Sequence, residues 1–482
     1  MKVEFSFKMH AGSLAEMCNG QLWKTSSDPA LLVYGLCTDS READRYTAFV
    51  ALHGERADGH NYIPDAIRAG CRCVICEQST EEIEQAGVTA IVVKDTELAL
   101  ATLAESFRNS FGGKVVAVTG SVGKTTTKDM IWAVLNESFK TYRTAGNHNS
   151  LIGMPLSVTE IPKDSEWAVL ELGMNHKGEI ERLAVACKPD YGIITSIGSA
   201  HLENFNDREG ICRAKLEILC GLKSGGTLLL NGDEPLLQNI GGKSYRTVYV
   251  SVEGRKADFS AKNIRVETEQ TLFDVEWSGG VTLDLSIPVM GKHNVYAALF
   301  AFAIGTISGM SPEEIRTGLS RFEPASLHQT RTECSGVTII EDCYNASPES
   351  MNAALDVLET YCAKTGKRGI AVLGDMLELG NESATLHRSV GAHLAGCGVD
   401  LLFTVGQGGN QIALGARQNG IPLSRISQNP DRGDLARTVD ALRTAVRPGD
   451  AILVKASRAL HAEDIGTALK AYLRSGDQQS HA

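Results

Sequence analysis

The chain has 482 residues, of which 43% are hydrophobic, 22% charged and 6% aromatic, and its formal net charge is −11. This globular composition excludes a disordered, collagen-like or low-complexity chain. The acidic balance provides no overall basic field, so no nucleic-acid partner is predicted. At about 150 residues per domain, the length predicts three domains.

The N-terminal stretch, the most apolar stretch and the cysteines indicate the compartment. Residues 1–20 lack an apolar core, so no signal peptide is predicted. Residues 295–310 are interrupted by polar residues and glycines and are shorter than the roughly 20 residues of a membrane span, which favours a buried helix. Twelve cysteines are too few for a disulfide scaffold. We therefore expect a cytoplasmic protein without a membrane span.

Three segments with different patterns follow one another. Residues 1–95 hold short apolar runs such as TAFVAL and end in the strand-like GVTAIVVKD. Residues 96–327 begin with helical spacing after a potential N-cap, Asp95, and then alternate strand-like and helix-like runs, which predicts a mostly parallel sheet. Alternating short runs between 258 and 289 predict an antiparallel insert. Residues 328–482 repeat the α/β rhythm in VTIIED, GIAVLGD, LLFTVG and DAILVKAS. These ranges are the predicted domains.

The strongest local signal is TGSVGKTTTKDM, Thr119 to Met130, between the strand-like KVVAV and a helical pattern. A phosphate-binding loop needs this context, because its backbone N–H groups and the helix dipole face the phosphates. Lys124 is suited to the β/γ oxygens, and a threonine hydroxyl to Mg²⁺. The loop is a short G-x-x-G-K-T-T form, since Val118 stands where a strict P-loop has its first glycine.

Four further sites are weaker when each is taken alone. Glu171 ends an apolar strand, where a carboxylate can complete a Mg²⁺ shell or simply be solvated. His201 follows the run YGIITSI and Lys215 lies in a helical stretch; each is more often structural than functional. Asn294 precedes an apolar helix and could be only its N-cap. Asp342 ends another apolar run, where a capped strand-to-helix turn is the alternative.

Taken in order, these segments resemble the motif series of the Mur ligases, the ATP-dependent amide-forming enzymes of peptidoglycan precursor synthesis. The series is TGSVGKTTTKDM, ELGMNHKGEI, AHLENF with AKLEI, GKHNV, DCYNASPESM, VLGDMLELG and LVKASR. The DCYNASP, VLGDMLELG and ELGMNHKGEI blocks are most similar to members that add D-alanyl-D-alanine to UDP-N-acetylmuramoyl-tripeptide, and TDSR and FVALHGERADGHNYI resemble their UDP-binding domain. The DNPR-type signature of the relative that adds diaminopimelate or lysine does not occur in the sequence.

The resemblance implies a three-domain α/β architecture with a central P-loop parallel sheet and a C-terminal Rossmann-like domain. The first domain would bind the UDP-sugar peptide and the second ATP, while the third would close over the nucleotide and the dipeptide. In the implied reaction, the tripeptide carboxylate attacks the γ-phosphate of ATP, with Mg²⁺ present, and the D-alanyl-D-alanine amine attacks the resulting acyl phosphate. A monomer is expected.

The resemblance also implies residue roles, carried over position by position. Catalysis falls to Lys124, Glu171, His201 and Lys215, and Mg²⁺ binding to Thr125, Glu171, His201 and a carbamoylated Lys215. Nucleotide binding falls to Gly120, Ser121, Val122, Gly123, Lys124, Thr125, Thr126, Asn294, Arg331 and Asp342. Substrate binding falls to Ser40, Arg41, Asn147, Asn175, His176, Tyr344 and Asn345.

Four positions depart from the family pattern without removing a phosphate or metal group: Ala297, Ser347, Ala459 and His148. A related ligase or polyglutamate synthase with another amino-acid acceptor is the main alternative function. A P-loop switch or motor NTPase is disfavoured, because neither an NKxD signal nor a strictly spaced Walker A occurs in the sequence. A non-catalytic homologue that binds the UDP-sugar is the third alternative.

Overall fold

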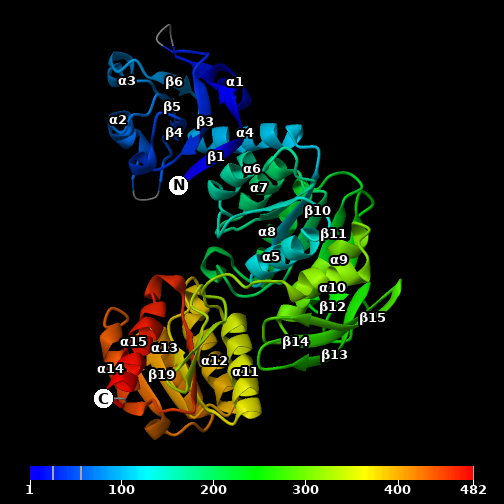
Figure 1. Ribbon diagram of the computed structural model, residues 1–482, viewed down its shortest axis with the longest axis vertical. Coiled ribbons are helices and arrows are strands. Elements are labelled where there is room, and N and C mark those ends of the chain that lie inside the picture. Colours follow the sequence, from blue (N-terminus) through cyan, green and yellow to red (C-terminus); the bar gives the residue numbers. More distant parts are fainter. Residues whose placement is uncertain (24–26, 55–56, 481–482) are drawn as a thin grey trace.

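The computed structural model describes residues 1–23, 27–54 and 57–480. Within these ranges the strands form three sheets of six, nine and six strands, arranged in chain order from the top to the bottom of Figure 1. The predicted α/β class with three sheets is therefore confirmed, whereas the exact boundaries at 95/96 and 327/328 stay predictions. None of the helices in the described ranges has the length and apolar character needed to cross a membrane.

The N-terminal sheet has the order β1-β3-β4-β5-β6-β2, in which β3 to β6 are parallel and both edge strands are antiparallel. Its strands are β1 Lys2–His10, β2 Gln21–Leu22, β3 Leu32–Cys37, β4 Thr47–Val50, β5 Cys73–Cys76 and β6 Thr89–Val92. The helices are α1 Ala11–Met17, α2 Ile63–Arg68 and α3 Glu81–Gln85, with 3₁₀ turns η1 Ser40–Glu42 and η2 Gly59–Tyr62.

The central sheet has the order β15-β14-β13-β12-β11-β10-β7-β9-β8. Its strands are β7 Lys114–Thr119, β8 Thr141–Arg143, β9 Trp167–Glu171, β10 Tyr191–Ile194, β11 Thr227–Asn231, β12 Arg246–Ser251, β13 Phe259–Val266, β14 Thr271–Trp277 and β15 Gly280–Ile287. The helices are α4 Thr96–Ser110, α5 Lys124–Leu135, α6 Gly153–Thr159, α7 Glu179–Cys187, α8 Arg208–Leu216, α9 Asn294–Ile307 and α10 Pro312–Ser320. Strands β13 to β15 are antiparallel, as predicted, but β13 pairs in parallel with β12, so they extend the main sheet instead of forming a separate insert.

Both faces of the parallel part of the central sheet are covered, which explains why β7, β9, β10 and β11 are buried almost throughout, whereas β13 and β15 include exposed polar residues. Along β7, Val115 and Ala117 face the cluster that includes α4, α6 and α7, whereas Val116 and Val118 face α5, α9 and α10. Alternating side chains of one strand point to opposite faces. The stretch 295–310, predicted to be a buried helix, lies within and just after α9, whose Val295–Ile304 side chains are almost all buried.

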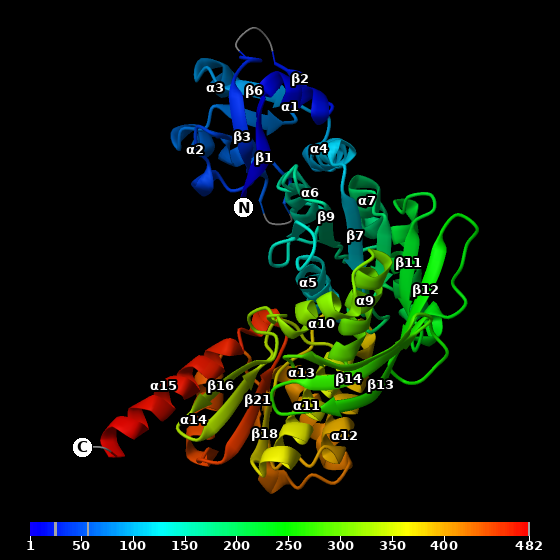
Figure 2. The same cartoon turned by 45° about the vertical axis from the view of Figure 1, so that its right-hand side comes forward.

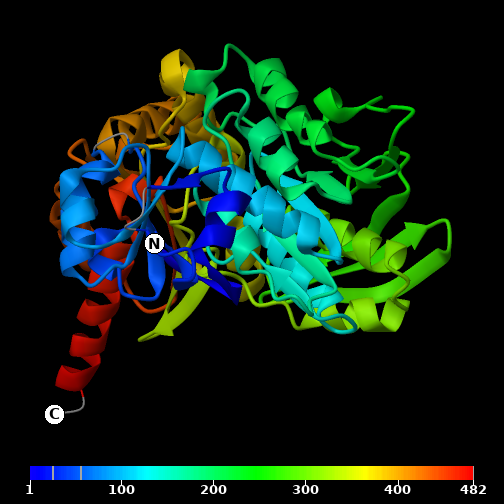
Figure 3. The same ribbon diagram turned by 90° about the horizontal axis from the view of Figure 1, so that it is seen from above.

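The C-terminal sheet has the order β16-β17-β21-β18-β19-β20, and all of its strands except β16 are parallel. Its strands are β16 Thr330–Cys334, β17 Val337–Glu341, β18 Arg368–Leu373, β19 Leu401–Val405, β20 Ile426–Asn429 and β21 Asp450–Lys455. The helices are α11 Pro348–Thr365, α12 Ser383–Gly396, α13 Gly406–Gln418, α14 Leu435–Ala445 and α15 Glu463–Ser480, the last of which projects from the body in Figures 2 and 3.

Helix α4 joins the first two sheets. Asp95 caps it as predicted, because the Asp95 side chain accepts a hydrogen bond from the backbone N–H of Leu98. Its buried face packs on α6 and α7 of the central body, while the Phe107 ring lies 5.3 Å from Phe5 and 5.2 Å from Phe7 on β1. The N-terminal and central bodies therefore share one hydrophobic cluster.

Candidate active site

The phosphate-type loop lies between β7 and α5, in the predicted strand–loop–helix context. Gly120 and Gly123 have positive φ values of 154° and 83°. A Cβ on Gly120 would lie 1.8 Å from Thr195 Oγ1, so a larger residue would displace the end of β10. The amides of Ser121 and Val122 donate to the backbone oxygen and the hydroxyl of Ser196, at 3.0 Å each. The loop is thus fixed to the neighbouring strand.

Lys124 begins helix α5 and folds back over the loop. Its ammonium donates to the Gly120 carbonyl at 2.8 Å and lines the cavity described below. Burial lowers the pKa of Lys124, while the charge of Glu171 opposes this shift. An anion entering the loop would therefore meet a partly desolvated ammonium and the positive end of a helix.

Glu171 lies at the carboxyl end of β9, which pairs in parallel with β7. Its carboxylate is 1% exposed and accepts hydrogen bonds from Thr125 Oγ1 at 3.0 Å and Asn149 Nδ2 at 2.7 Å. Lys128 Nζ lies 3.7 Å from the same carboxylate. A hydroxyl and a carboxylate at a phosphate loop are hard oxygen donors, which is the donor chemistry that Mg²⁺ takes. These residues therefore fit a Mg²⁺ ion.

Lys215 of α8 is a second unusual lysine, because only 2% of it is exposed. Burial, together with the nearby charge of Lys124, holds the pKa of Lys215 well below its usual range. Among the residues that the structure describes, no carboxylate pairs with it. An unpaired buried lysine is expected to be neutral, and a neutral amine is a nucleophile.

His201 connects the central and C-terminal bodies. Its Nδ1 lies 2.5 Å from Glu378 Oε2, a residue of the predicted VLGDMLELG block. The Glu203 amide also donates to the Glu378 carbonyl at 3.1 Å. This pairing lowers the pKa of Glu378. The predicted metal ligand thus contacts a carboxylate of the C-terminal body, and its metal role stays a prediction.

The C-terminal body contributes a second charged group to the site. Lys455, at the end of β21, is 2% exposed and donates to Asp342 Oδ2 at 2.6 Å and to the Asn345 carbonyl at 3.0 Å. Glu349, in the first turn of α11, accepts from the amide and hydroxyl of Ser199 across the interface at 2.9 and 3.0 Å.

A cavity of about 500 Å³ lies between the two bodies, and its lining brings many of the predicted residues together. From the central body these are Ser121, Val122, Gly123, Lys124, Thr125, Thr126, Glu171, Asn175, His201 and Asn294, and from the C-terminal body Asp342, Tyr344 and Asn345. Asn294 also donates to the Met290 carbonyl at 2.8 Å. The adjacent His293 is neutral at physiological pH, because burial lowers its pKa to about 4.

Several predicted residues do not line this cavity. Arg331 pairs with Glu269 at 2.6 Å, and Lys215 and Gly120 lie outside the lining. His176 and Asn147 also lie outside it. Ser40 and Arg41 form η1 in the distant N-terminal body, where Arg41 pairs with Asp39. Their roles stay predictions.

Several residues of the site, Lys128 and Glu349 among them, escaped the sequence analysis. Asn149 donates a hydrogen bond to Glu171, and Lys455 donates one to Asp342. The His328 ring, whose Nε2 is buried, lies 4.5 Å from the Tyr344 ring. Lys455 stands inside the recognised block LVKASR, and Asn149 lies two residues after the predicted Asn147, so closer attention to polar residues at these places could have found them. No local signal distinguishes His328 within its sequence neighbourhood.

The chain matches three family models: the Mur ligase family catalytic domain over residues 32–108, the Mur ligase middle domain over 118–305, and the Mur ligase glutamate ligase domain over 321–458. It belongs to the Mur ligase family, as the sequence motifs predicted.

Individual relatives resemble it over almost their whole length. The UDP-N-acetylmuramoyl-tripeptide–D-alanyl-D-alanine ligase of Bacillus subtilis is 40% identical over 94% of this chain and 96% of its own. The ligase of the same name from Escherichia coli is 32% identical over 83% and 86% of the two chains. The crystal structure of MurF from Acinetobacter baumannii superposes with a TM-score of 0.88 and is 31% identical, over 97% of this chain and 100% of its own. MurF ligase from Thermotoga maritima, solved in complex with ADP, superposes with a TM-score of 0.79 and is 27% identical, over 91% of this chain and 98% of its own.

Proposed function

We propose that the protein is an ATP-dependent ligase that adds D-alanyl-D-alanine to UDP-N-acetylmuramoyl-tripeptide, as the names of its relatives in Bacillus subtilis and Escherichia coli describe for those proteins. One observation carries the proposal: the phosphate loop with Thr125 and Glu171 faces Asp342 and Lys455 across one interdomain cavity. A nucleotide held by the loop would thus lie beside a second substrate held by the C-terminal body.

The reaction begins with two anions that repel each other. The terminal carboxylate of the tripeptide attacks the γ-phosphorus of ATP, ADP leaves with the bond's electron pair, and an acyl phosphate forms. Lys124 and the loop amides offset the repulsion and stabilise the charge that builds on the transferred phosphoryl group. When bound, Mg²⁺ adds neutralising charge at the phosphate oxygens.

The second step forms the amide. The neutral amine of D-alanyl-D-alanine attacks the acyl carbonyl carbon, loses a proton, and expels inorganic phosphate. Tyr344 and Asn345 line the C-terminal side of the cavity, and we assign them to the phosphate or the dipeptide. Asn294 and Asp342 are assigned to the nucleotide, with Asp342 suited to ribose hydroxyls. Ser40 and Arg41 are assigned to the UDP-sugar in the N-terminal body.

Thr125, Glu171 and His201 are the proposed Mg²⁺ ligands. We also assign a carbamoyl group to Lys215: its neutral nitrogen attacks CO₂, loses a proton, and becomes a carboxylate-like oxygen donor for a second Mg²⁺. The low pKa of Lys215 supports this assignment, because only the uncharged amine can react. We place the enzyme in the cytoplasm as a monomer, with domains 1–95, 96–327 and 328–482.

An acceptor-specificity assay tests the proposal. Purified protein is given ATP, Mg²⁺ and the UDP-tripeptide carrying either lysine or diaminopimelate, with labelled D-alanyl-D-alanine, L-lysine, diaminopimelate or glutamate. We expect label from the dipeptide alone in the product, and a hydroxamate when hydroxylamine traps the acyl phosphate. Incorporation of a different acceptor would point to another ligase of the family, and ATP hydrolysis without hydroxamate would point to an NTPase.

A further inference from the structure

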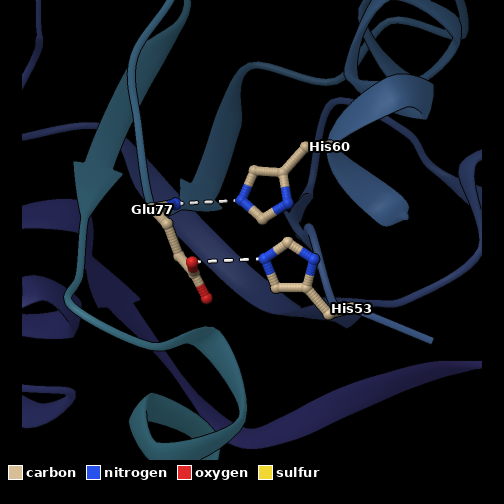
Figure 4. A group of neighbouring side chains, drawn as sticks. All are labelled: His53, His60 and Glu77. Carbon is tan, nitrogen blue, oxygen red and sulfur yellow. Dashed lines mark hydrogen bonds and ion pairs between the residues drawn. The ribbon is translucent and has the colours of Figure 1, made fainter. Parts of the chain in front are cut away.

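Three potential metal ligands meet at one edge of the N-terminal sheet, far from the phosphate loop. His53 follows β4, His60 lies in η2, and Glu77 follows β5 directly. A ligand atom from each residue lies within 4.8 Å of those of the other two. Figure 4 shows both imidazole rings facing Glu77. Because β4 and β5 are parallel neighbours, their carboxyl ends meet at the edge where such sheets bind ligands.

Asp58 orients both histidines. Its Oδ1 lies 2.8 Å from Nδ1 of His60 and 3.3 Å from Nδ1 of His53. A carboxylate at Nδ1 favours the tautomer with the proton on that atom, which leaves the lone pair on Nε2. The His60 Nε2 lone pair is indeed directed at Glu77, because it accepts the Glu77 backbone N–H at 3.0 Å. A carboxylate behind a ligating histidine is the usual outer shell of a protein metal site.

Glu77 is oriented as well. Its Oε1 accepts from the backbone N–H of Thr96 at 3.1 Å, at the start of α4. Its Oε2 is directed toward the rings and lies 3.2 Å from His53 Nε2. The His53 and His60 rings are 4.7 Å apart and tilted by 30°, so their Nε2 atoms lie on the same side. His60 and Glu77 are only 18% and 27% exposed, whereas the more exposed His53 closes the outer side.

We propose that His53 Nε2, His60 Nε2 and the Glu77 carboxylate bind one divalent transition-metal ion of the Zn²⁺ class, with water completing its shell. Two imidazoles and one carboxylate favour Zn²⁺ over Mg²⁺, which takes oxygen ligands almost alone. On binding, the ion replaces the His60–amide contact and the His53–Glu77 pair. The proposal depends only on this geometry. His53 and His60 lie in the segment FVALHGERADGHNYI, which resembles the UDP-binding domain of the family, and a Zn²⁺ titration tests the metal site separately from the proposed ligase reaction.

The ion would tie the segments after β4 and β5 to the first turn of α4, the helix that joins the N-terminal and central bodies. The competing interpretation is a metal-free ion pair, in which a protonated His53 bridges Asp58 and Glu77. Glu77 does raise the pKa of His53, as this pairing requires. The two interpretations differ in whether the three side chains bind Zn²⁺ together.

The test is a Zn²⁺ titration of the full-length protein against a chromophoric chelator, in saturating Mg²⁺ so that the oxygen sites are filled. Co²⁺ is the spectroscopic probe. The ligand variants are His53→Gln and Glu77→Gln, and Asp58→Asn alters the outer shell. The matched control is His393→Gln, because His393, Asp356 and Cys397 form the other three-residue group among the described residues.

We expect wild type and His393→Gln to retain one Zn²⁺ that His53→Gln and Glu77→Gln bind at least tenfold more weakly. Asp58→Asn should weaken it by about 10- to 100-fold, the usual effect of an outer-shell change. The Co²⁺ spectrum should lack thiolate charge-transfer bands. Wild-type affinity in both ligand variants overturns the proposal. So does an absence of Zn²⁺ binding in wild type, or a thiolate spectrum that disappears in His393→Gln. Circular dichroism checks that each variant is folded.

Discussion

The buried pair of Lys455 and Asp342 is a sensitive point of the candidate site. Replacing Lys455 by Met keeps most of the side-chain volume but removes the ammonium that contacts Asp342 and the Asn345 carbonyl. The Asp342 side chain is 14% exposed, so its charge would be left nearly buried without a partner. Breaking such a pair costs about 3–5 kcal/mol, and we expect the lower end because Asp342 faces the cavity.

Calorimetry on the full-length protein measures this loss. A 3 kcal/mol loss in a body of this size lowers the C-terminal melting transition by about 6–12 °C. Lys364→Met is the matched control, because Lys364 pairs with Glu267 while 37% exposed and should cost less than about 1 kcal/mol. Adding Asp342→Asn to Lys455→Met should restore at least about 1 kcal/mol, since the uncompensated charge is gone. A Lys455→Met shift no larger than the control's would refute the reasoning.

Four further predictions concern the same site. Glu171→Gln should lower kcat at least 100-fold and raise the Mg²⁺ concentration needed for half activity; an unchanged Mg²⁺ dependence would count against a metal role. Lys215→Ala should be inactive and regain activity with short carboxylic acids, whereas an unmodified structural lysine would give no rescue. Glu378→Gln should shift small-angle scattering toward a more open shape, because it weakens the contact between His201 and the C-terminal body. Finally, His293→Asn should reduce the loss of folding stability at acid pH.

The sign of the His293 effect follows from its pKa of about 4 in the folded protein. An unfolded histidine titrates near 6.5, so the unfolded state binds more protons between pH 6.5 and 4. Stability is therefore fully present above pH 6.5 and is lost as the pH falls through this window, by up to about 3 kcal/mol. Urea unfolding at pH 7 and pH 4.5 checks this, and equal acid losses in wild type and His293→Asn would contradict it.

The sequence predicted the features that depend on neighbouring residues. The loop from Gly120 to Lys124 was predictable because its spacing, the strand before it and the helix after it are all local. The capping of α4 by Asp95 was predictable for the same reason. The contact between Asn149 and Glu171 was not predictable from the sequence, because it depends on how the turn after β8 places Asn149 beside the end of β9. The resemblance assigned only Asn147, two residues earlier, and assigned it to the substrate.

Contacts between distant segments were beyond local patterns. His201 and Glu378 both stood in recognised blocks, yet only the docking of the two bodies pairs them. Lys455 reaches Asp342 because β17 and β21 are parallel neighbours, and strand order is a property of the whole sheet. The low pKa of Lys215 likewise arises from three-dimensional burial, since nothing in its helical stretch distinguishes it from a solvated lysine.

The two junctions of the central body differ in kind, and this has a mechanical consequence. The N-terminal junction is apolar through Phe5, Phe7 and Phe107, whereas the C-terminal junction includes the Lys364–Glu267 ion pair and the polar contact between His201 and Glu378. Salt weakens the attraction between exposed charges, with a screening length of about 8–10 Å at 0.1–0.15 M, but it does not weaken apolar burial. Rising ionic strength should therefore weaken the C-terminal junction and leave the N-terminal junction intact. The N-terminal and central bodies should then move together as one rigid unit relative to the C-terminal body.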